Sequence, residues 1–290
     1  MQSQRDGDSV EVSPRAAMLI AGLFEQATGQ TLSQDRFWRI GTTLTPFCKA
    51  RGIDSIEQLA MRLGQGSSPE LSLDTIDALL NNETSFFRDP GVFSLIGDEL
   101  LPRIAARRQR EKRIRIWSAA CSTGQEVYSL SMMFAEQAER WAGWRIEILG
   151  SDISRSAVAQ ARSGLYSQFE VQRGLPIRQL LAWFDHVLDN GWRAKPQITS
   201  MVGFTRHNLL GPPPAGGRFD MILCRNALLY FNPERRHQML EGLALAIAPD
   251  GALLLGAGET ARGASSRFVN DADMPMVYRP AAYGSLPHAA

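Results

Sequence analysis

The chain has 290 residues, enough for one large domain or two smaller ones. Its formal net charge of +1 gives no general nucleic-acid signal, and its three cysteines lack the paired spacing of a disulfide framework. The four histidines show no metal-ligand spacing, and no apolar run reaches the roughly 20 residues of a membrane span. We therefore expect a cytoplasmic protein that binds neither metal nor nucleic acid and does not insert into a membrane.

Helical patterns, and no strand pattern, occupy the first third of the chain. The first helix is expected to begin at Ser13 and Pro14, with the proline in its first turn. A later helix starts near Ser55, which has a glutamine three residues on, as in a capping box. We predict a helical domain over residues 14–80, preceded by a disordered segment over residues 1–13.

A strand, a turn of small residues and a helix follow one another between residues 114 and 134. Residues 114–117 start with the alternation of a strand, small residues lead to Gly124, and apolar side chains then recur at helical spacing. Doubly wound sheets build nucleotide sites in this way, because the backbone approaches the ligand and the helix N-terminus supplies N–H groups. One glycine is a weak signature, however, and an ordinary tight turn would look the same.

Further strand patterns predict the rest of the sheet. Residues 145–153 form a strand with Asp152 near its end, where such folds hold ribose hydroxyls. Two more strands are predicted at residues 219–224 and 251–256, and a final one at residues 276–279. Helical patterns separate the first four strands, so we predict an α/β fold with a mostly parallel sheet.

Residues 164–206 break this rhythm of strands and helices. Two short strand patterns, at residues 191–194 and 201–205, follow a helical pattern. We interpret the whole stretch as a small inserted subdomain with antiparallel strands. Residues 281–290 show no pattern and are expected to form a flexible tail.

The segment between the helical domain and the sheet is unusual in composition. Residues 81–90 place several polar side chains and Arg88 next to the adjacent aromatic residues Phe86 and Phe87. Taken alone, the segment reads as a loop that is anchored by its two aromatic side chains and exposes its arginine.

Six basic side chains lie close together at residues 103–113. A solvated helix end, favoured by the helix dipole, is the simplest interpretation. The alternative is a surface that docks a partner, for which Arg107, Arg108 and Arg110 are the candidates.

Five segments, taken together and in order, resemble those of the CheR-type chemoreceptor methyltransferases, which use S-adenosylmethionine to methylate receptor glutamates. The segments are residues 82–88 (NETSFFR), 117–124 (WSAACSTG), 151–154 (SDIS), 208–210 (NLL) and 224–231 (CRNALLYF). The resemblance covers about residues 15–280. It implies a class I Rossmann-like methyltransferase sheet over residues 81–280, with the helical N-terminal domain before it and the antiparallel β-subdomain inserted in it.

The resemblance also implies a set of site residues. Glu126 would contact the methionine part of the cofactor, Asp152 the ribose, and Asn208 and Leu209 the adenine. Arg88 and Tyr230 correspond to the methyl-transfer site. The implied cofactor-binding residues are Asn82, Thr84, Arg88, Ala120, Glu126, Asp152, Ile153, Asn208, Leu209, Arg225 and Asn226.

The function implied by the resemblance is methylation of glutamate carboxylates on methyl-accepting chemoreceptors, for adaptation in chemotaxis or related chemosensory signalling. The products would be glutamate methyl esters and S-adenosylhomocysteine. A glutamate side chain, with an ordinary pKa of about 4.3, is ionised at neutral pH and needs no general base. A methyltransferase with another acceptor and an S-adenosylmethionine-binding regulator are the alternatives.

Some positions depart from the pattern of this family. The family commonly has Glu-Glu-Pro-Tyr after the turn glycine, where this chain has residues 125–128 (QEVY), and Gly258 replaces a serine before Glu259. The inserted subdomain is short, which favours recognition of the cytoplasmic helical region of the receptor without a C-terminal pentapeptide.

Overall fold

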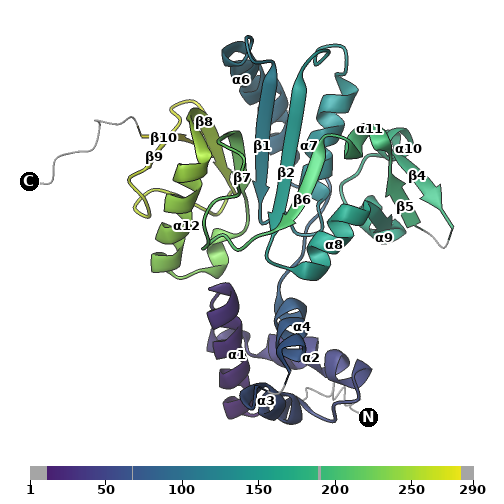
Figure 1. Ribbon diagram of the computed structural model, residues 1–290, viewed down its shortest axis with the longest axis vertical. Helices are drawn as coiled ribbons and strands as arrows, with labels where there is room; N and C mark the ends of the chain where they lie inside the picture. The colour runs from purple at the N-terminus through teal and green to yellow at the C-terminus, as the bar shows by residue number, and fades with distance from the viewer. Residues whose placement is uncertain (1–11, 67, 189–190, 282–290) are drawn as a thin grey trace, which may run out of the picture. The chain divides into compact units, whose positions relative to one another are not determined.

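The fold is described from a computed structural model of the chain (Figure 1). The structure describes residues 12–66, 68–188 and 191–281, so nearly all of the predicted disordered segment 1–13 and of the predicted tail 281–290 lies outside the described residues. The chain divides into two compact units. The helical unit comprises Met1–Asn81 with Tyr230–Asn232, and the sheet unit comprises Asn82–Leu229 with Pro233–Ala290.

The helical unit is built from four α-helices and a short 3₁₀ turn among its described residues. Serine side chains begin three of the helices: Ser13, Ser55 and Ser68 accept hydrogen bonds from the backbone N–H groups of the first turns. Gly29, with φ of 75°, ends the first helix in the left-handed conformation. The elements are α1 (Pro14–Thr28), η1 (Gln34–Arg36), α2 (Trp38–Ala50), α3 (Ile56–Gly64) and α4 (Pro69–Leu79).

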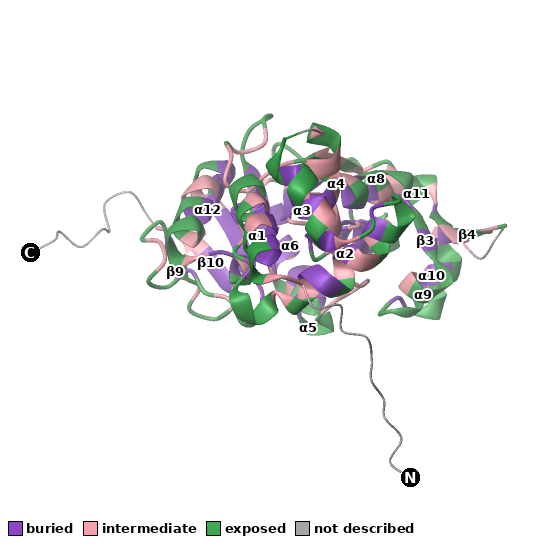
Figure 2. Cartoon of the chain, turned by 90° about the horizontal axis from the view of Figure 1, so that it is seen from below, coloured by how far each residue is buried: buried purple, intermediate pink, exposed green. Residues whose placement is uncertain are grey.

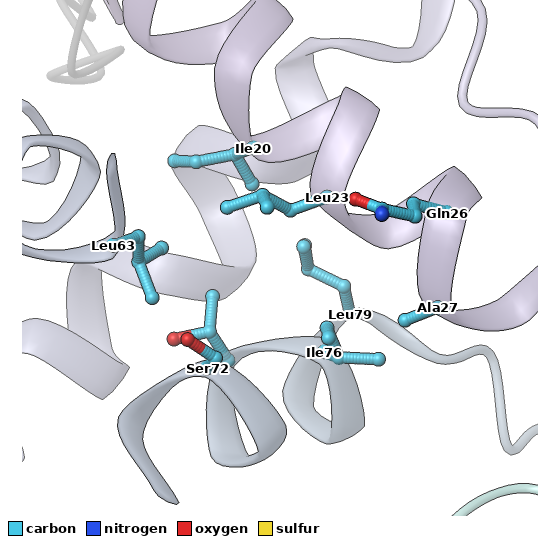
Figure 3. A pocket seen from close by; sticks show the side chains of 9 residues that line it. Ile20, Leu23, Gln26, Ala27, Leu63, Ser72, Ile76 and Leu79 are labelled. Atoms are coloured by element: carbon cyan, nitrogen blue, oxygen red, sulfur yellow. The ribbon is translucent and has the colours of Figure 1, made fainter. Parts of the chain in front are cut away.

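A cavity of about 310 Å³ lies within the helical unit, between α1 and α4 (Figure 3). Leu23 and Leu79 face each other across it, and Leu63 of α3 borders it. The hydroxyls of Ser72 and Thr75, which also line it, donate to backbone carbonyls of their own helix. The cavity is therefore predominantly apolar, and none of its lining residues belongs to the predicted site.

The sheet unit contains a seven-stranded sheet with the order β6-β2-β1-β7-β8-β10-β9 (Figure 1). The strands from β6 to β8 run parallel, while β10 is antiparallel to both of its neighbours. The strands are β1 (Arg113–Ala119), β2 (Arg145–Asp152), β6 (Val202–Arg206), β7 (Phe219–Cys224), β8 (Ile247–Leu255), β9 (Phe268–Asn270) and β10 (Val277–Pro280).

Numbered within this sheet, the strand order is 3-2-1-4-5-7-6, so its first five strands follow the order of a doubly wound α/β sheet. The predicted fold class is therefore confirmed. The order reverses between β1 and β7, and ligands of open α/β sheets bind at the carboxyl ends of the strands beside such a reversal.

The accompanying helices are α5 (Pro90–Leu95), the π turn η2 (Ile96–Leu100), α6 (Leu101–Arg107), α7 (Gln125–Glu136), α8 (Arg155–Ser163), η3 (Leu228–Tyr230) and α12 (Pro233–Ala246).

A second, three-stranded antiparallel sheet lies beyond the β6 edge of the main sheet (Figure 1). It has the order β3-β5-β4 and confirms that the insertion contains antiparallel strands. Its elements are β3 (Leu165–Ser167), α9 (Gln168–Gln172), α10 (Ile177–Trp183), β4 (Phe184–Val187), β5 (Gly191–Ala194) and α11 (Pro196–Thr199).

The placement of residues 201–205 in this insertion was wrong. Residues 202–205 belong to β6, which pairs in parallel with β2 at the edge of the main sheet. A short edge strand that is only partly buried lacks the long apolar run of a central strand, so its pattern does not reveal which sheet it joins. The inserted subdomain therefore ends before β6 rather than at residue 206.

Buried side chains on one face of the main sheet form a core with the helices that cover this face. Ile114 and Ile116 of β1 pack with Val127 of α7 and Leu254 of β8. Figure 2 maps burial along the chain, with both buried and exposed residues along α12 and α1. In the described part of the chain, no helix is long and apolar enough to cross a membrane.

Arg108, one of the predicted docking arginines, is held in an ion-pair network at the amino ends of the strands. Its Nε donates to Asp220 at 2.7 Å, and its two terminal nitrogens donate to Asp250 at 2.8 and 2.5 Å. Asp220 also accepts the backbone N–H of Arg115 at 2.8 Å. The hydrogen bonds from Arg108 lower the pKa of the Asp250 carboxyl below its ordinary value. Arg108 thus joins α6 to β1, β7 and β8.

We predict that Arg108→Ala lowers the free energy of unfolding by roughly 2–3 kcal/mol, because Asp220 is buried and loses a charged partner. The folded-state pKa of Asp250 lies below its unfolded value. Its ion pair therefore stabilises the fold above about pH 4, and this contribution is lost as the pH falls further. Urea unfolding at pH 7 and pH 3 measures both effects. An equal loss of stability at both values would contradict this account.

Candidate functional site

The turn between β1 and α7 is tight and has left-handed backbone at three positions. Ala120, Ser122 and Gly124 have φ of 62°, 51° and 93°. A Cβ atom on Gly124 would lie 2.9 Å from Cβ of Ala161, so both the conformation and the space require glycine there. The turn therefore brings its backbone, and the N-terminus of α7, to the carboxyl end of the parallel strands.

Asp152, at the end of β2, ties this turn to the next loop. One of its carboxylate oxygens accepts the backbone N–H of Ser122 at 2.8 Å, and the other accepts that of Ser154 at 2.9 Å. The side chain is buried, with 8% exposure. Each carboxylate oxygen can accept two hydrogen bonds, so the same group is also able to receive ribose hydroxyls.

Asn82 lies against the same two loops. Its backbone carbonyl accepts a hydrogen bond from the Ser122 hydroxyl at 2.6 Å, and its side-chain nitrogen Nδ2 donates to the Ser154 hydroxyl at 3.3 Å. The start of the junction segment, which is distant in sequence from Asp152, is thereby joined to the ends of β1 and β2.

The two adjacent aromatic residues of the junction have different surroundings. Phe86 is fully buried and packs edge-on against Tyr166 and Phe184 of the small sheet, with ring centroids 5.0 and 5.6 Å apart. Phe87 packs against Phe93 of α5 at 5.2 Å and reaches the core of the main sheet. The expected anchoring by the aromatic pair is confirmed. The structure adds that Phe86 belongs to the core beside the small sheet, while Phe87 packs against both this core and that of the main sheet.

The backbone around Arg88 is left-handed on both sides. Phe87 has φ of 46° and Asp89 has φ of 61°. Such conformations cost about 1 kcal/mol or more for residues other than glycine, and surrounding contacts must hold them. The N–H of Phe87 donates to the Ser129 hydroxyl at 3.0 Å, and the N–H of Phe86 donates to the Arg173 carbonyl at 3.2 Å. The half-buried Arg88 side chain is presented by this constrained turn and donates to the Glu83 carbonyl at 3.4 Å.

Glu126, at the start of α7, lies between Ser118 and Arg225. The Ser118 hydroxyl donates to one carboxylate oxygen at 2.8 Å, and Arg225 donates to the other at 2.9 Å. Arg225 also donates to the Arg88 carbonyl at 3.0 Å and pairs with Asp89. The predicted residues Arg88, Glu126 and Arg225 are thus connected.

Glu259 is a residue that sequence reasoning undervalued. One of its carboxylate oxygens accepts the backbone N–H groups of Asn226 and Gly256 at 2.7 and 2.8 Å, and the other accepts that of Leu228 at 2.7 Å. It therefore fixes the turn after β7, in which Asn226 has φ of 57°. The sequence signal for Glu259 is an acid shortly after the fourth predicted strand. The family pattern also has a glutamate at this position, and only Gly258 before it departs from the pattern.

Among the remaining predicted residues of the sheet unit, Ala120 follows β1, Ile153 follows β2, and Asn208 and Leu209 follow β6. Asn208 accepts the N–H of Leu210 on its side-chain oxygen at 3.0 Å, while His207, just before it, donates its N–H to the Asp152 carbonyl at 2.8 Å. The other members of this group are half-buried: Thr84, Ala120, Ile153 and Leu209.

Tyr230, the second predicted transfer residue, belongs to the helical unit. The amide nitrogen of Asn81 donates to its hydroxyl at 2.6 Å, and its backbone carbonyl accepts the N–H of Thr31 at 2.9 Å. Within that unit, Asn81 therefore orients the Tyr230 side chain and Thr31 holds its backbone.

Two cysteines adjoin the strand ends, and both are buried. Desolvation raises the pKa of the Cys121 and Cys224 thiols well above the ordinary value. Neither residue is therefore a thiolate at neutral pH, and neither suits nucleophilic chemistry.

Comparison with known proteins identifies the sheet unit. Residues 82–274 match the family model described as "CheR methyltransferase, SAM binding domain". The chain belongs to the CheR methyltransferase family. It is 32% identical over 262 residues to the chemotaxis protein methyltransferase of Vibrio parahaemolyticus, covering 90% of this chain and 94% of the relative. It is 35% identical over 238 residues to chemotaxis protein methyltransferase 1 of Pseudomonas aeruginosa, covering 81% and 86%.

The residues at the strand ends of this CheR family member fit S-adenosylmethionine. A carboxylate such as that of Glu126 suits the ammonium group of this cofactor, and one such as that of Asp152 suits its ribose hydroxyls. The buried Nε–H of Arg225 has no hydrogen-bond partner in the described parts of the chain, as expected of a donor whose partner is a ligand. No group of potential metal ligands occurs among the described residues.

We predict that Gly124→Ala raises the dissociation constant for S-adenosylhomocysteine by roughly tenfold, because the new methyl group forces the turn to shift. Calorimetric titration measures the change. Gly258→Ala is the matched control, since a Cβ there meets nothing within 4 Å and φ is not positive. Equal affinities of both variants and the wild type would contradict the required conformation at Gly124.

Proposed function

We propose that this CheR-family methyltransferase methylates glutamate carboxylates in the cytoplasmic helical region of chemoreceptors, for adaptation in chemotaxis or related chemosensory signalling. The observation that carries the proposal is similarity, over 81–90% of the chain, to relatives named chemotaxis protein methyltransferases. The products are a glutamate methyl ester and S-adenosylhomocysteine. We also propose that the protein acts in the cytoplasm, where that part of the receptor lies.

Little acid–base chemistry is required of the protein. When bound, S-adenosylmethionine supplies a methyl group that its sulfonium already activates. A glutamate carboxylate is ionised at neutral pH, so the site needs no base to generate the nucleophile. A carboxylate oxygen gains the methyl group as the carbon–sulfur bond breaks, and opposite charges are neutralised. Catalysis then depends mainly on holding the two groups in line.

Arg88 is the proposed partner of the acceptor carboxylate. Its guanidinium can form charge-assisted hydrogen bonds that orient the carboxylate and offset the loss of its hydration. The left-handed turn that carries Arg88 is held between two cores, which restricts where the guanidinium can lie. Tyr230, oriented by Asn81, is the proposed second residue of the transfer site.

The proposed receptor-docking surface includes the exposed side chains of Arg107 and Arg110 together with the β-subdomain. Arg108 was also a candidate, but it is engaged by Asp220 and Asp250. We therefore assign Arg108 a structural role. Arg107 also donates to the backbone carbonyl of Asp250 at 2.7 Å, but its side chain is exposed, so we retain Arg107 and Arg110 as candidates for receptor contacts.

The test of this function is transfer of radiolabelled methyl groups to a cytoplasmic chemoreceptor fragment, scored as base-labile label. We expect label that is lost when the receptor glutamates are replaced by alanine. An RNA and a casein sample serve as unrelated acceptors. Clear cofactor binding without receptor labelling would contradict the proposal and favour another acceptor or a regulatory role.

Receptor recognition is proposed to be independent of a C-terminal pentapeptide. The same fragment with and without its last five residues is therefore expected to be methylated at rates within about twofold, well below the tenfold change that 1.4 kcal/mol produces. A loss of labelling on truncation would overturn this part of the proposal while leaving the reaction itself intact.

We predict that Arg88→Ala lowers kcat/KM for the receptor fragment by about a hundredfold or more, because the acceptor carboxylate loses its charged partner. The affinity for S-adenosylhomocysteine is expected to change much less. Arg88→Lys retains the positive charge but lacks the planar arrangement of donors, so its kcat/KM should lie between those of the wild type and of Arg88→Ala. Full turnover by Arg88→Ala, with unchanged cofactor affinity, would remove Arg88 from the transfer site.

A further inference from the structure

Arg225 connects the cofactor side of the site to the segment that carries Arg88. Its side chain is only 3% exposed, and it pairs with both Glu126 and Asp89. The same nitrogen that pairs with Asp89 also donates to the backbone carbonyl of Arg88 at 3.0 Å. The guanidinium of Arg225 therefore holds two parts of the site at the same time: the carboxylate of Glu126, which is predicted to contact the cofactor, and the turn that carries Arg88.

We propose that Asp89 and Arg225 are positioning residues that hold Arg88 in register with Glu126, an inference that rests on the proposed role of Arg88. Asp89 acts through Arg225 and through the backbone of its neighbour, so it need not touch the reacting groups. The guanidinium is suited to this role because its planar fork of donors serves several acceptors at once.

The backbone conformation makes such a brace necessary. Phe87 and Asp89, on either side of Arg88, both have positive φ, and this is particularly unfavourable for a bulky residue such as Phe87. The N–H groups of Phe86 and Phe87 are held by Arg173 and Ser129. The contacts of Arg225 with Arg88 and Asp89 hold the following part of the turn. Loss of the Asp89 carboxylate removes one of these two contacts and therefore loosens the turn next to Arg88.

The charges around Arg225 are also expected to affect the affinity for the cofactor. Two carboxylates, Asp89 and Glu126, share one guanidinium, so the group carries a net negative charge beside the predicted position of a cationic cofactor. Asp89→Asn removes that net charge, and Arg225 is left to neutralise Glu126 alone. S-adenosylmethionine carries one positive charge more than S-adenosylhomocysteine. Its affinity should consequently fall further than that of the product.

The experiment compares Asp89→Asn, Arg88→Ala and the double variant in the full-length protein, with Asp98→Asn as control. Asp98 is an exposed acid in the neighbouring η2 turn. Asp89 is about half exposed, and asparagine preserves its shape, so the variant is expected to fold. Binding of both cofactor forms is measured by calorimetry, and turnover is measured with the receptor fragment.

We expect Asp89→Asn to raise the dissociation constant of S-adenosylmethionine by about tenfold, and that of S-adenosylhomocysteine by less. We expect its kcat to fall about tenfold to a hundredfold, since a small displacement of a positioning group is enough. In the Arg88→Ala background, Asp89→Asn should lower kcat little further, because the guanidinium that Asp89 helps to position is already absent. Asp98→Asn should behave as the wild type.

Equal loss of affinity for the two cofactor forms, or none, would overturn the charge argument. A kcat effect that adds fully to that of Arg88→Ala would overturn the positioning role. If the wild-type protein binds cofactor but does not methylate the receptor, the proposed function fails. The binding comparison then still decides whether the charge of Asp89 acts on the bound cofactor.

Discussion

Two carboxylates that accept backbone N–H groups organise the end of the sheet where the site lies. Asp152 joins the loops after β1 and β2, and Glu259 joins the end of β8 to the turn after β7. Loops at strand ends have few ladder hydrogen bonds of their own, so their conformation depends on such acceptors. The left-handed residues on these loops, Ala120, Ser122 and Asn226, are tolerated because the acceptors over-determine their positions.

The junction segment depends on this organised end of the sheet. Asn82 at its start bonds to the loops that Asp152 joins, and the carbonyl of Arg88 near its end bonds to Arg225, beside the turn that Glu259 fixes. Packing of Phe86 and Phe87 into two cores adds a non-polar restraint between these points. Contacts on three sides thus offset the conformational cost of the left-handed turn around Arg88. They make the turn a rigid platform for the Arg88 side chain. A rigid platform suits a reaction that requires alignment more than proton transfer.

Much of this architecture could be predicted from the sequence because it follows from local patterns. The alternation at β1, the small residues up to Gly124 and the acid at the end of β2 each have a direct physical meaning. The parts that were missed depend on pairing between distant segments. The pattern of β6 does not name its neighbour in the sheet, and nothing near Arg108 in sequence reveals that Asp220 and Asp250 engage it. Glu259 acts on backbone groups of a turn more than thirty residues earlier, so no local spacing marks it.

The family resemblance supplied the candidate site residues, and the structure supplied their connections. Neither the role of Asp89 nor the shared use of Arg225 follows from a motif, since both depend on three-dimensional geometry. The contacts and exposure of the arginines also distinguish their roles. Arg88 is presented by a turn, Arg108 and Arg225 are held in ion pairs, and Arg107 and Arg110 are exposed on the surface.

The most direct measurement is the chemical identity of the methylated residue. A receptor fragment is incubated with the protein and trideuteromethyl-labelled S-adenosylmethionine, and its peptides are sequenced by tandem mass spectrometry at low pH, where methyl esters survive. The account predicts the mass of one trideuteromethyl group on glutamate side chains of the helical region. The same label on lysine, arginine or asparagine side chains, with none on glutamate, would contradict the central claim.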